Sequence, residues 1–338
     1  MRQGADAVPR LRMVSPSSPG WSRIRRGSGF SYVDTDGSRL PAHAAEHCRS
    51  LVIPPAWQDV WICPHSNGHL QAVGVDDAGR RQYLYHPEWR RRRDEAKFDH
   101  VLRVAARLPA ARRAVTRRLR SDGMSRDRVL AVCFRMLDRG LFRIGGEEYA
   151  DDEGGYGLVT LEKRHTRLES DRAVFGYEGK GGKQQNVALS DPDLLPAVQI
   201  LCRRRGGSER LLAYKNGRRW RDLTSGDVND YLKDLLGEDA SAKDFRTWHA
   251  TVLAAIALAT DRPTSATARK RTVARVMREV ADDLGNTASV ARSSYVDPRI
   301  VDLFEDGRTV DPALARADLT RPSARASAER AVLALLTS

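Results

Sequence analysis

The chain has 338 residues, of which 41% are hydrophobic and 30% are charged, so it can bury a core and is neither disordered throughout nor collagen-like. Its 57 lysine and arginine residues outnumber its 44 aspartate and glutamate residues, and the net charge of +13 favours a polyanionic partner, most often nucleic acid. The longest apolar run, residues 252–259, is far shorter than the ~20 residues that cross a membrane, and the first residues lack the apolar stretch of a secretory signal, so we expect a soluble, cytoplasmic protein without a membrane partner.

The first part of the chain has a sequence pattern that predicts a small β domain. At ~150 residues per domain, the length predicts two domains in all. Residues 1–20 mix proline, serine, glycine and arginine without periodicity, and we expect them to be disordered. Residues 21–92 hold short β-branched or aromatic runs that are broken by turn signals such as Asn67-Gly68. This pattern is typical of an antiparallel sheet.

The second part, residues 93–311, is mainly helical, because apolar residues recur there at spacings of three and four. A β segment at 157–165 and a hairpin around the turn 179–183 interrupt the helices, and Gly285 is placed to end one of them. Residues 312–338 form a tail. The fold class is therefore α+β, a small antiparallel β-rich N-terminal domain followed by a mostly α-helical domain with a small β-sheet. The expected helices cover residues 94–120, 125–139, 190–204, 225–236, 242–260, 267–284 and 325–336.

The cysteines give no sign of a metal site or a disulfide framework. They are scattered, with no Cys-x-x-Cys pair and no nearby set of histidines. We expect buried thiols in a reducing compartment at Cys48, Cys63, Cys133 and Cys202.

Four segments of the second part carry residue types suited to chemistry on phosphates. Taken singly, each has an ordinary structural interpretation, since short motifs give many false matches: a surface base, a solvated lysine, an ion pair or a half-buried core tyrosine. They are Phe142-Arg143-Ile144-Gly145, the turn Gly179-Lys180-Gly181-Gly182-Lys183, the run Lys243 to His249, and Leu284-Gly285-Asn286 followed nine residues later by Tyr295.

Together and in this order, the segments resemble the poxvirus-type and bacterial type IB DNA topoisomerases. The resemblance extends from about Gly29 to Phe304, and in the first part it includes the runs GFSYVD and RRQYLYHP. One position departs from the poxvirus pattern, because asparagine stands at 286 where those enzymes have histidine, and an amide cannot titrate to transfer a proton. The resemblance implies that the catalytic residues are Arg143, Lys180, Arg246, Asn286 and Tyr295.

These residue types suit a transesterification at a phosphodiester. Tyr295 supplies a phenol as nucleophile, and the two arginines match the non-bridging oxygens on which negative charge builds. Asn286 can add a neutral hydrogen bond. By the resemblance, Lys180 is the general acid that protonates the leaving 5′-oxygen, with Lys183 as the lesser candidate. The two arginines would replace a metal clamp, and the lysine turn is not a Walker A loop, so we expect no metal, no ATP and no other cofactor.

The resemblance also implies duplex DNA as the partner. Gln82, Tyr83 and Tyr85 match an element that contacts DNA bases in the poxvirus enzymes, and the glutamine suits an adenine edge. The neighbouring Arg80 and Arg81 suit phosphates. The two tyrosines alternate on one strand face, so they could instead belong to the core. We expect a monomeric, nucleoid-associated enzyme whose two domains close as a clamp around DNA and relax supercoils through a 3′-phosphotyrosyl intermediate.

Two other functions remain open on the sequence. A tyrosine recombinase shares the arginines, lysine and tyrosine, but typically has His-x-x-Arg at the second arginine, where this chain has Lys243. A non-catalytic, basic DNA-packaging protein would need no ordered catalytic set. Relaxation of a plasmid in EDTA without ATP is expected of the topoisomerase alone.

Overall fold

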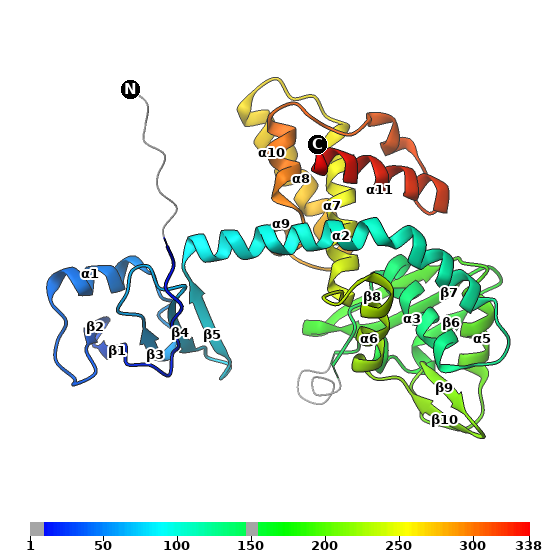
Figure 1. Cartoon of the computed structure of the whole chain (residues 1–338), viewed down its shortest axis with the longest axis horizontal. Helices are drawn as coiled ribbons and strands as arrows, with labels where there is room; N and C mark the ends of the chain where they lie inside the picture. Colours follow the sequence, from blue (N-terminus) through cyan, green and yellow to red (C-terminus); the bar gives the residue numbers. More distant parts are fainter. Residues whose placement is uncertain (1–9, 147–154) are drawn as a thin grey trace. The chain divides into compact units, whose positions relative to one another are not determined.

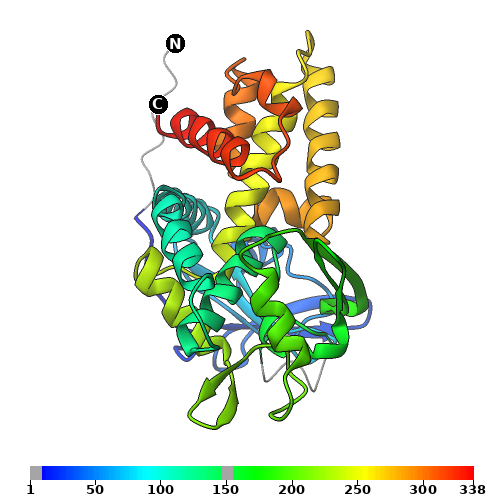
Figure 2. The same ribbon diagram turned by 90° about the vertical axis from the view of Figure 1, so that its right-hand side faces the viewer.

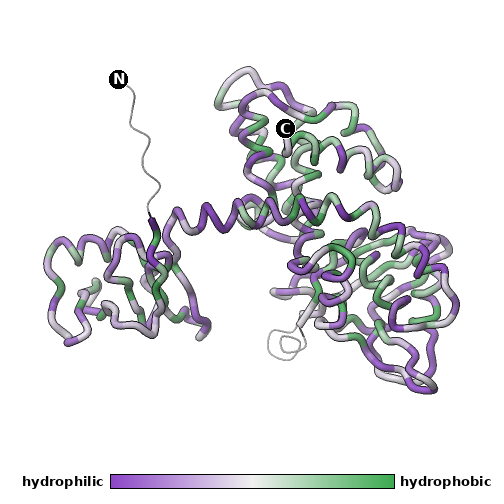
Figure 3. Tube along the Cα trace, viewed as in Figure 1, coloured by the Kyte–Doolittle hydropathy of each residue, from purple (hydrophilic) through white to green (hydrophobic). Residues whose placement is uncertain are grey.

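The computed structural model describes residues 10–146 and 155–338, and the chain divides into two compact units between Phe98 and Asp99 (Figure 1). The division falls inside the long helix α2, Pro87–Leu119, and not at the residue where the sequence changes from β-like to helical texture. The first turns of this helix, residues 87–97, are strongly hydrophilic (Figure 3). Among the described residues, no helix has the length and apolar composition needed to cross a membrane.

The first unit is built on a five-stranded antiparallel sheet, as the sequence predicts. The strand order is β2-β1-β3-β4-β5, and one helix that the sequence did not predict, α1 (Ala42–Ser50), packs against it. The small core includes Cys48, Ile62 and Ala72, all almost fully buried. The strands are β1 Trp21–Arg26, β2 Gly29–Val33, β3 Gln58–Ile62, β4 Leu70–Val75 and β5 Arg81–Tyr85.

Residues 10–20 are ordered, so the prediction of disorder for residues 1–20 is wrong for this part; residues 1–9 lie outside the described residues. Arg12 bridges to the β3–β4 connection: its N–H donates to the Asn67 carbonyl at 2.9 Å, and its carbonyl accepts from the His69 N–H at 2.9 Å. The Ser18 carbonyl accepts from the Trp61 indole at 3.0 Å. Backbone pairing of this kind does not need apolar periodicity, which explains why the composition gave no signal.

The second unit is mostly helical, and one hydrophobic core joins buried residues of its helices to those of its β-strands. Helix α3 lies at the centre, and its residues 128–138 are all buried. It begins after Ser125, whose hydroxyl accepts the Arg128 N–H at 3.2 Å. Besides α3 (Arg126–Gly140), the helices are α5 Leu195–Arg203, α6 Ser225–Leu236, α7 Ala242–Ala259, α8 Ala266–Leu284, α9 Ala288–Ser294, α10 Pro298–Glu305 and α11 Pro322–Thr337.

The predicted hairpin is present as β7 (Ala173–Gly179) and β8 (Lys183–Leu189), and β6 (Thr166–Leu168) adds a third strand. The predicted β segment at 157–165 is wrong, because this stretch forms two 3₁₀ turns, Leu158–Thr160 and Lys163–His165. Neighbouring residues 158, 159 and 161 are all fully buried, so the stretch lacks the alternation of a half-exposed strand. A two-stranded hairpin, β9 (Ala213–Asn216) with β10 (Arg219–Asp222), was not predicted.

The C-terminal residues belong to this unit and are not a separate tail. Figure 2 shows α11, in red, close to α7, and Ala328 and Val332 of α11 are fully buried in the core. Buried charges also hold α11. Asp138 of α3 accepts from Arg112 at 2.7 Å and from Arg325 at 2.9 Å, and the carboxylate of Glu329 accepts from both arginines.

Replacing Asp138 with asparagine is expected to lower the free energy of unfolding by about 3–5 kcal/mol, because two buried arginines lose one of the two carboxylates that they share. Burial alone would raise the pKa of Asp138, but Arg325 and Arg112 lower it to about 2. The carboxylate therefore stabilises the fold above its ordinary pKa of about 4, and this contribution is lost as pH falls toward 2. Urea unfolding of both proteins at pH 7 and at pH 3 measures the free energy lost on substitution and the decrease of that difference at low pH.

The matched control is Asp230→Asn on α6, since that carboxylate is 71% exposed and pairs with the exposed Lys233. A change below about 0.5 kcal/mol is expected there. Equal destabilisation by the two substitutions would contradict the role given to the buried cluster.

Candidate active site

Arg143 is held in place by the chain that leaves α3. Helix α3 ends at Leu141, which adopts a left-handed conformation (φ 54°), and the next side chain, Phe142, is fully buried. The Phe142 ring packs edge-on against Phe175 at 5.4 Å between centroids. The Arg143 guanidinium then donates from Nη2 to Oδ1 of Asn286 at 2.6 Å. The first and fourth of the predicted segments are thus in direct contact.

Arg246 lies on the first turns of α7 and is 5% exposed. It donates to the carbonyl of Leu141 at 2.5 Å and to the carbonyl of Leu284 at 2.6 Å, so it joins the residues that precede Arg143 and Asn286. Burial and the charge of Arg143 lower the pKa of Arg246. Within the described residues neither arginine has a carboxylate partner, which leaves a pair of cations ready for an anion.

Tyr295 follows α9 directly, and its N–H donates to the Ala291 carbonyl at 3.0 Å. The Arg246 guanidinium carbon lies 5.4 Å from the centroid of the tyrosine ring, and the Lys243 ammonium lies 5.8 Å from it. The Tyr295 carbonyl is 3.3 Å from the hydroxyl of Thr251. All three of these neighbours belong to α7, so this helix positions the tyrosine through both its ring and its backbone.

Asn286 reaches Arg143 because α8 ends sharply. Gly285 ends the helix, as the sequence predicts, in a left-handed conformation (φ 61°) that lets the Asn286 N–H bond back to the Ala281 carbonyl at 2.9 Å. The next residue, Thr287, caps α9 through its hydroxyl. The short helix α9 therefore separates Asn286 from Tyr295. Among the described residues, the Asn286 side-chain nitrogen is buried without a hydrogen-bond partner.

Lys180 shares a cavity of about 300 Å³ with both arginines. It lies in the exposed turn between β7 and β8, where Gly181 and Gly182 take positive φ values. Lys183 is exposed and does not line this cavity. The structure thus brings Arg143, Lys180 and Arg246 together around one cavity, and Asn286 and Tyr295 contact the two arginines.

Two close glycine contacts hold this arrangement, and sequence reasoning missed them. A Cβ on Gly157 would lie 2.4 Å from the Gly145 Cα, and a Cβ on Gly155 would lie 3.0 Å from the backbone nitrogen of Lys180. The chain at 155–159 is bonded to both neighbours, because Leu158 N–H donates to the Arg143 carbonyl and Tyr156 N–H donates to the Glu178 carbonyl, each at 2.8 Å. Residues 155–159 therefore connect the segment that carries Arg143, residues 141–146 (the Arg143 loop), with the β7–β8 hairpin that carries Lys180.

Other cavity-lining residues were also missed. They include Tyr177, Gln185 and Asp283. Every second residue of β7 is buried: Ala173, Phe175, Tyr177 and Gly179. Because strand residues alternate between the two faces, counting back by twos from the lysine turn would have identified Tyr177 as a buried residue.

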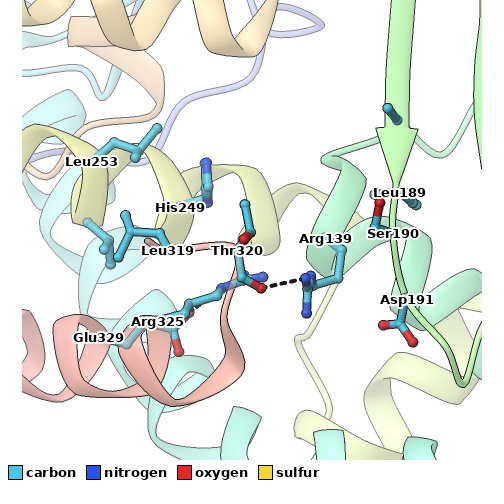
Figure 4. A pocket seen from close by; sticks show the side chains of 12 residues that line it. Arg139, Leu189, Ser190, Asp191, His249, Leu253, Leu319, Thr320, Arg325 and Glu329 are labelled. Carbon is cyan, nitrogen blue, oxygen red and sulfur yellow. Dashed lines mark hydrogen bonds and ion pairs between the residues drawn. The ribbon is translucent and has the colours of Figure 1, made fainter. Parts of the chain in front are cut away.

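A separate cavity of about 390 Å³ lies between α7, α11 and the end of β8 (Figure 4). His249, the last residue of the third predicted segment, lines this cavity and not the one with Lys180. Burial and nearby Arg325 lower the pKa of His249 to about 3, so it is a neutral ring at pH 7. Arg139 donates to the Thr320 carbonyl at 2.7 Å across the same cavity. Among the described residues, no group of three or more histidine, cysteine, aspartate or glutamate side chains is placed to hold a metal ion.

The five residues predicted to contact DNA lie on or beside β5, an edge strand of the first unit. Tyr83 and Tyr85 are not core residues: they are 45% and 37% exposed, and their rings stack at 6.2 Å. Arg80 and Gln82 both bond to Asp76, at 3.1 Å and 2.9 Å. Arg81 is exposed. The strand therefore presents two aromatic faces and a basic side chain to solvent.

Comparison with known proteins places the chain among DNA topoisomerases. The family described as eukaryotic DNA topoisomerase I, catalytic core, matches residues 86–305, and the bacterial DNA topoisomerase IB N-terminal domain matches residues 29–76. The chain is 25% identical to DNA topoisomerase 1B of Acanthamoeba polyphaga mimivirus, over 84% of this chain and 87% of that protein. It is 22% identical to DNA topoisomerase 1B of vaccinia virus, over 81% and 82% of the two chains.

The chain therefore belongs to the type IB DNA topoisomerases, enzymes of the isomerase class. Within that class it joins a catalytic core of the eukaryotic type to an N-terminal domain of the bacterial type.

Proposed function

We propose that this enzyme relaxes supercoiled duplex DNA by cutting one strand, holding its 3′-phosphate on Tyr295, and rejoining it. The observation that carries the proposal is Arg246, a buried arginine with no carboxylate partner among the described residues, which lies beside the tyrosine ring and shares a cavity with Arg143. A buried cation without an anion is a costly arrangement that a bound phosphate would relieve.

In the proposed reaction, the Tyr295 oxygen attacks the phosphorus as its O–H proton passes to solvent, the bond from phosphorus to the 5′-oxygen breaks, and a phosphotyrosyl bond forms. The departing 5′-oxygen takes up a proton and becomes the 5′-hydroxyl. Arg143 and Arg246 bind the two non-bridging oxygens, where charge builds in the transition state. Asn286 already accepts from Arg143, and its unpartnered side-chain N–H₂ is free to donate to the same phosphate. Rejoining is the reverse attack by the 5′-hydroxyl.

Lys180 is the proposed general acid for the 5′-oxygen. It lines the cavity with both arginines, whereas Lys183, which the sequence leaves as an alternative, does not. One ester bond replaces another in the reaction, so the energy of the cut bond is kept in the phosphotyrosyl link. We therefore expect no ATP requirement, and the arginine pair supplies the positive charge that a metal ion supplies in other phosphoryl transfers.

We propose that DNA contacts both units, which act as a clamp, and that the enzyme works as a monomer at the nucleoid. Exposed Tyr83 and Tyr85 offer stacking or base-edge contacts, and the basic side chains of Arg80 and Arg81 suit phosphates. Gln82 is the residue suited to an adenine edge, provided that DNA displaces its bond to Asp76.

The test is relaxation of a negatively supercoiled plasmid in EDTA and without ATP. Complete relaxation, together with a protein–DNA adduct trapped by detergent, supports the proposal. Absence of relaxation while DNA is still bound would instead favour a packaging protein. A strict requirement for magnesium or ATP would contradict the metal-free mechanism.

Replacing Gly157 with alanine is expected to slow strand cleavage by about 100-fold, because the new Cβ would press on Gly145 and displace the Arg143 loop. Single-turnover adduct formation measures the rate. Gly226→Ala is the control, since a Cβ there meets its nearest atom at an ordinary 3.6 Å. Unchanged cleavage by the Gly157 variant would show that residues 155–159 do not position Arg143.

A further inference from the structure

Tyr177 is a buried tyrosine in the candidate active site, and its hydroxyl has no hydrogen-bond partner among the described residues. It is 6% exposed, and its ring stacks on Phe142 at 5.9 Å with an angle of 12° between the planes. Because phenylalanine would fill the same space, packing alone does not explain a tyrosine here.

The cavity around this side chain is lined by three basic side chains, and by Asp282 and Asp283 as well. Tyr177 lines the cavity with Arg143, Lys180 and Arg246, and it precedes Lys180 by three residues on the same hairpin. Its charged form would interact with both arginines. The group that these arginines are placed to bind is a phosphate, and a hydroxyl at the same cavity wall is a donor without an acceptor.

The hydroxyl keeps its proton throughout the working range of pH. Burial raises the pKa of Tyr177 to about 12, although Arg143 and Arg246 act to lower it. A phenol that keeps its proton can donate one O–H bond and is a poor nucleophile, which separates this role from the attack assigned to Tyr295.

We propose that the Tyr177 hydroxyl donates a hydrogen bond to one non-bridging oxygen of the phosphate that Arg143 and Arg246 bind. It is thus a further catalytic residue that acts on the charge of the transition state. The inference rests on the proposed strand cleavage by Tyr295. It adds a neutral donor, rigidly held by the Phe142 stack, to the two charged donors and the asparagine.

The test is single-turnover cleavage by Tyr177→Phe on three substrates: an ordinary phosphodiester and the two phosphorothioate diastereomers at the cut site. On the ordinary substrate, cleavage is expected to slow about 10- to 100-fold, the range for a hydrogen bond to a charged group. Sulfur is a weak acceptor. With sulfur in place of the oxygen that Tyr177 contacts, variant and unmutated enzyme should cleave at nearly the same rate. With the other diastereomer the full penalty should remain.

Tyr231→Phe on α6 is the matched control, because burial raises the pKa of that tyrosine to about 12 as well, but it does not line the cavity. We expect its rates to equal those of the unmutated enzyme. Equal slowing of Tyr177→Phe on all three substrates, or no slowing on any, would overturn the inference while leaving Tyr295 cleavage intact. Failure of the unmutated enzyme to form an adduct would overturn the proposed function, and the inference with it.

Discussion

Replacing Tyr295 with phenylalanine is expected to abolish both plasmid relaxation and the covalent protein–DNA adduct. The change removes one oxygen, the atom that would carry the phosphoryl group, and keeps the ring beside Arg246. Duplex binding should stay within a few-fold, because one hydroxyl contributes little to an interface dominated by phosphate contacts. Denaturing gels detect the adduct, and a filter-binding titration measures the affinity.

The result separates the role of Tyr295 from the role inferred for Tyr177. Tyr177→Phe should still form adduct, only more slowly. An adduct formed by Tyr295→Phe would show that another residue is the nucleophile, and Tyr156 and Tyr177, which line the cavity, would be tested next.

Replacing Lys180 with alanine is expected to slow cleavage of ordinary DNA by roughly 10²–10⁴, the usual range for a lost general acid. A substrate with sulfur in place of the 5′-oxygen has a leaving group that departs without a proton. On that substrate Lys180→Ala should be almost as fast as the unmutated enzyme. Arg143→Ala, which weakens binding of the non-bridging oxygens, should gain much less from the sulfur.

Lys183→Ala is the matched control, because it is a second lysine of the same turn that does not line the cavity. We expect a small effect on ordinary DNA and none on the sulfur substrate. If sulfur rescued Lys183→Ala and not Lys180→Ala, the general acid would be three residues further along. If sulfur rescued neither, the proton would come from elsewhere.

Most of the second unit could be predicted from the sequence because its helices carry a clear apolar period and clear end signals. Helix α6 has the predicted bounds, and Gly285 ends α8, as predicted. The candidate catalytic residues could be named because each lies in a recognisable segment. The stretch 158–165 could not, because its buried apolar residues alone do not distinguish a strand from 3₁₀ turns.

What the sequence could not show were contacts between distant segments. The two carbonyls that Arg246 binds lie 105 and 38 residues away in the chain. Every residue has a backbone carbonyl, so the sequence does not indicate which ones a side chain will contact. The approach of Gly157 to Gly145 is likewise visible only once the chain is folded. The ordering of residues 10–20 depends on backbone pairing with the β3–β4 connection. Helix α11 was predicted, but its attachment through Asp138 was not.

The contacts of Tyr295 with α7 distinguish two parts of the site. One part is a single rigid body, in which α7 carries Arg246 and touches the nucleophile at ring and backbone. The other is the β7–β8 hairpin with Lys180, where a Cβ on Gly181 would meet nothing within 4 Å. In the proposed mechanism, a change confined to the turn residues beside Lys180, with β7 and its Tyr177 kept, would therefore alter how long each nick stays open, and so how many supercoils are lost per cut, while Arg246 and Tyr295 stay in place.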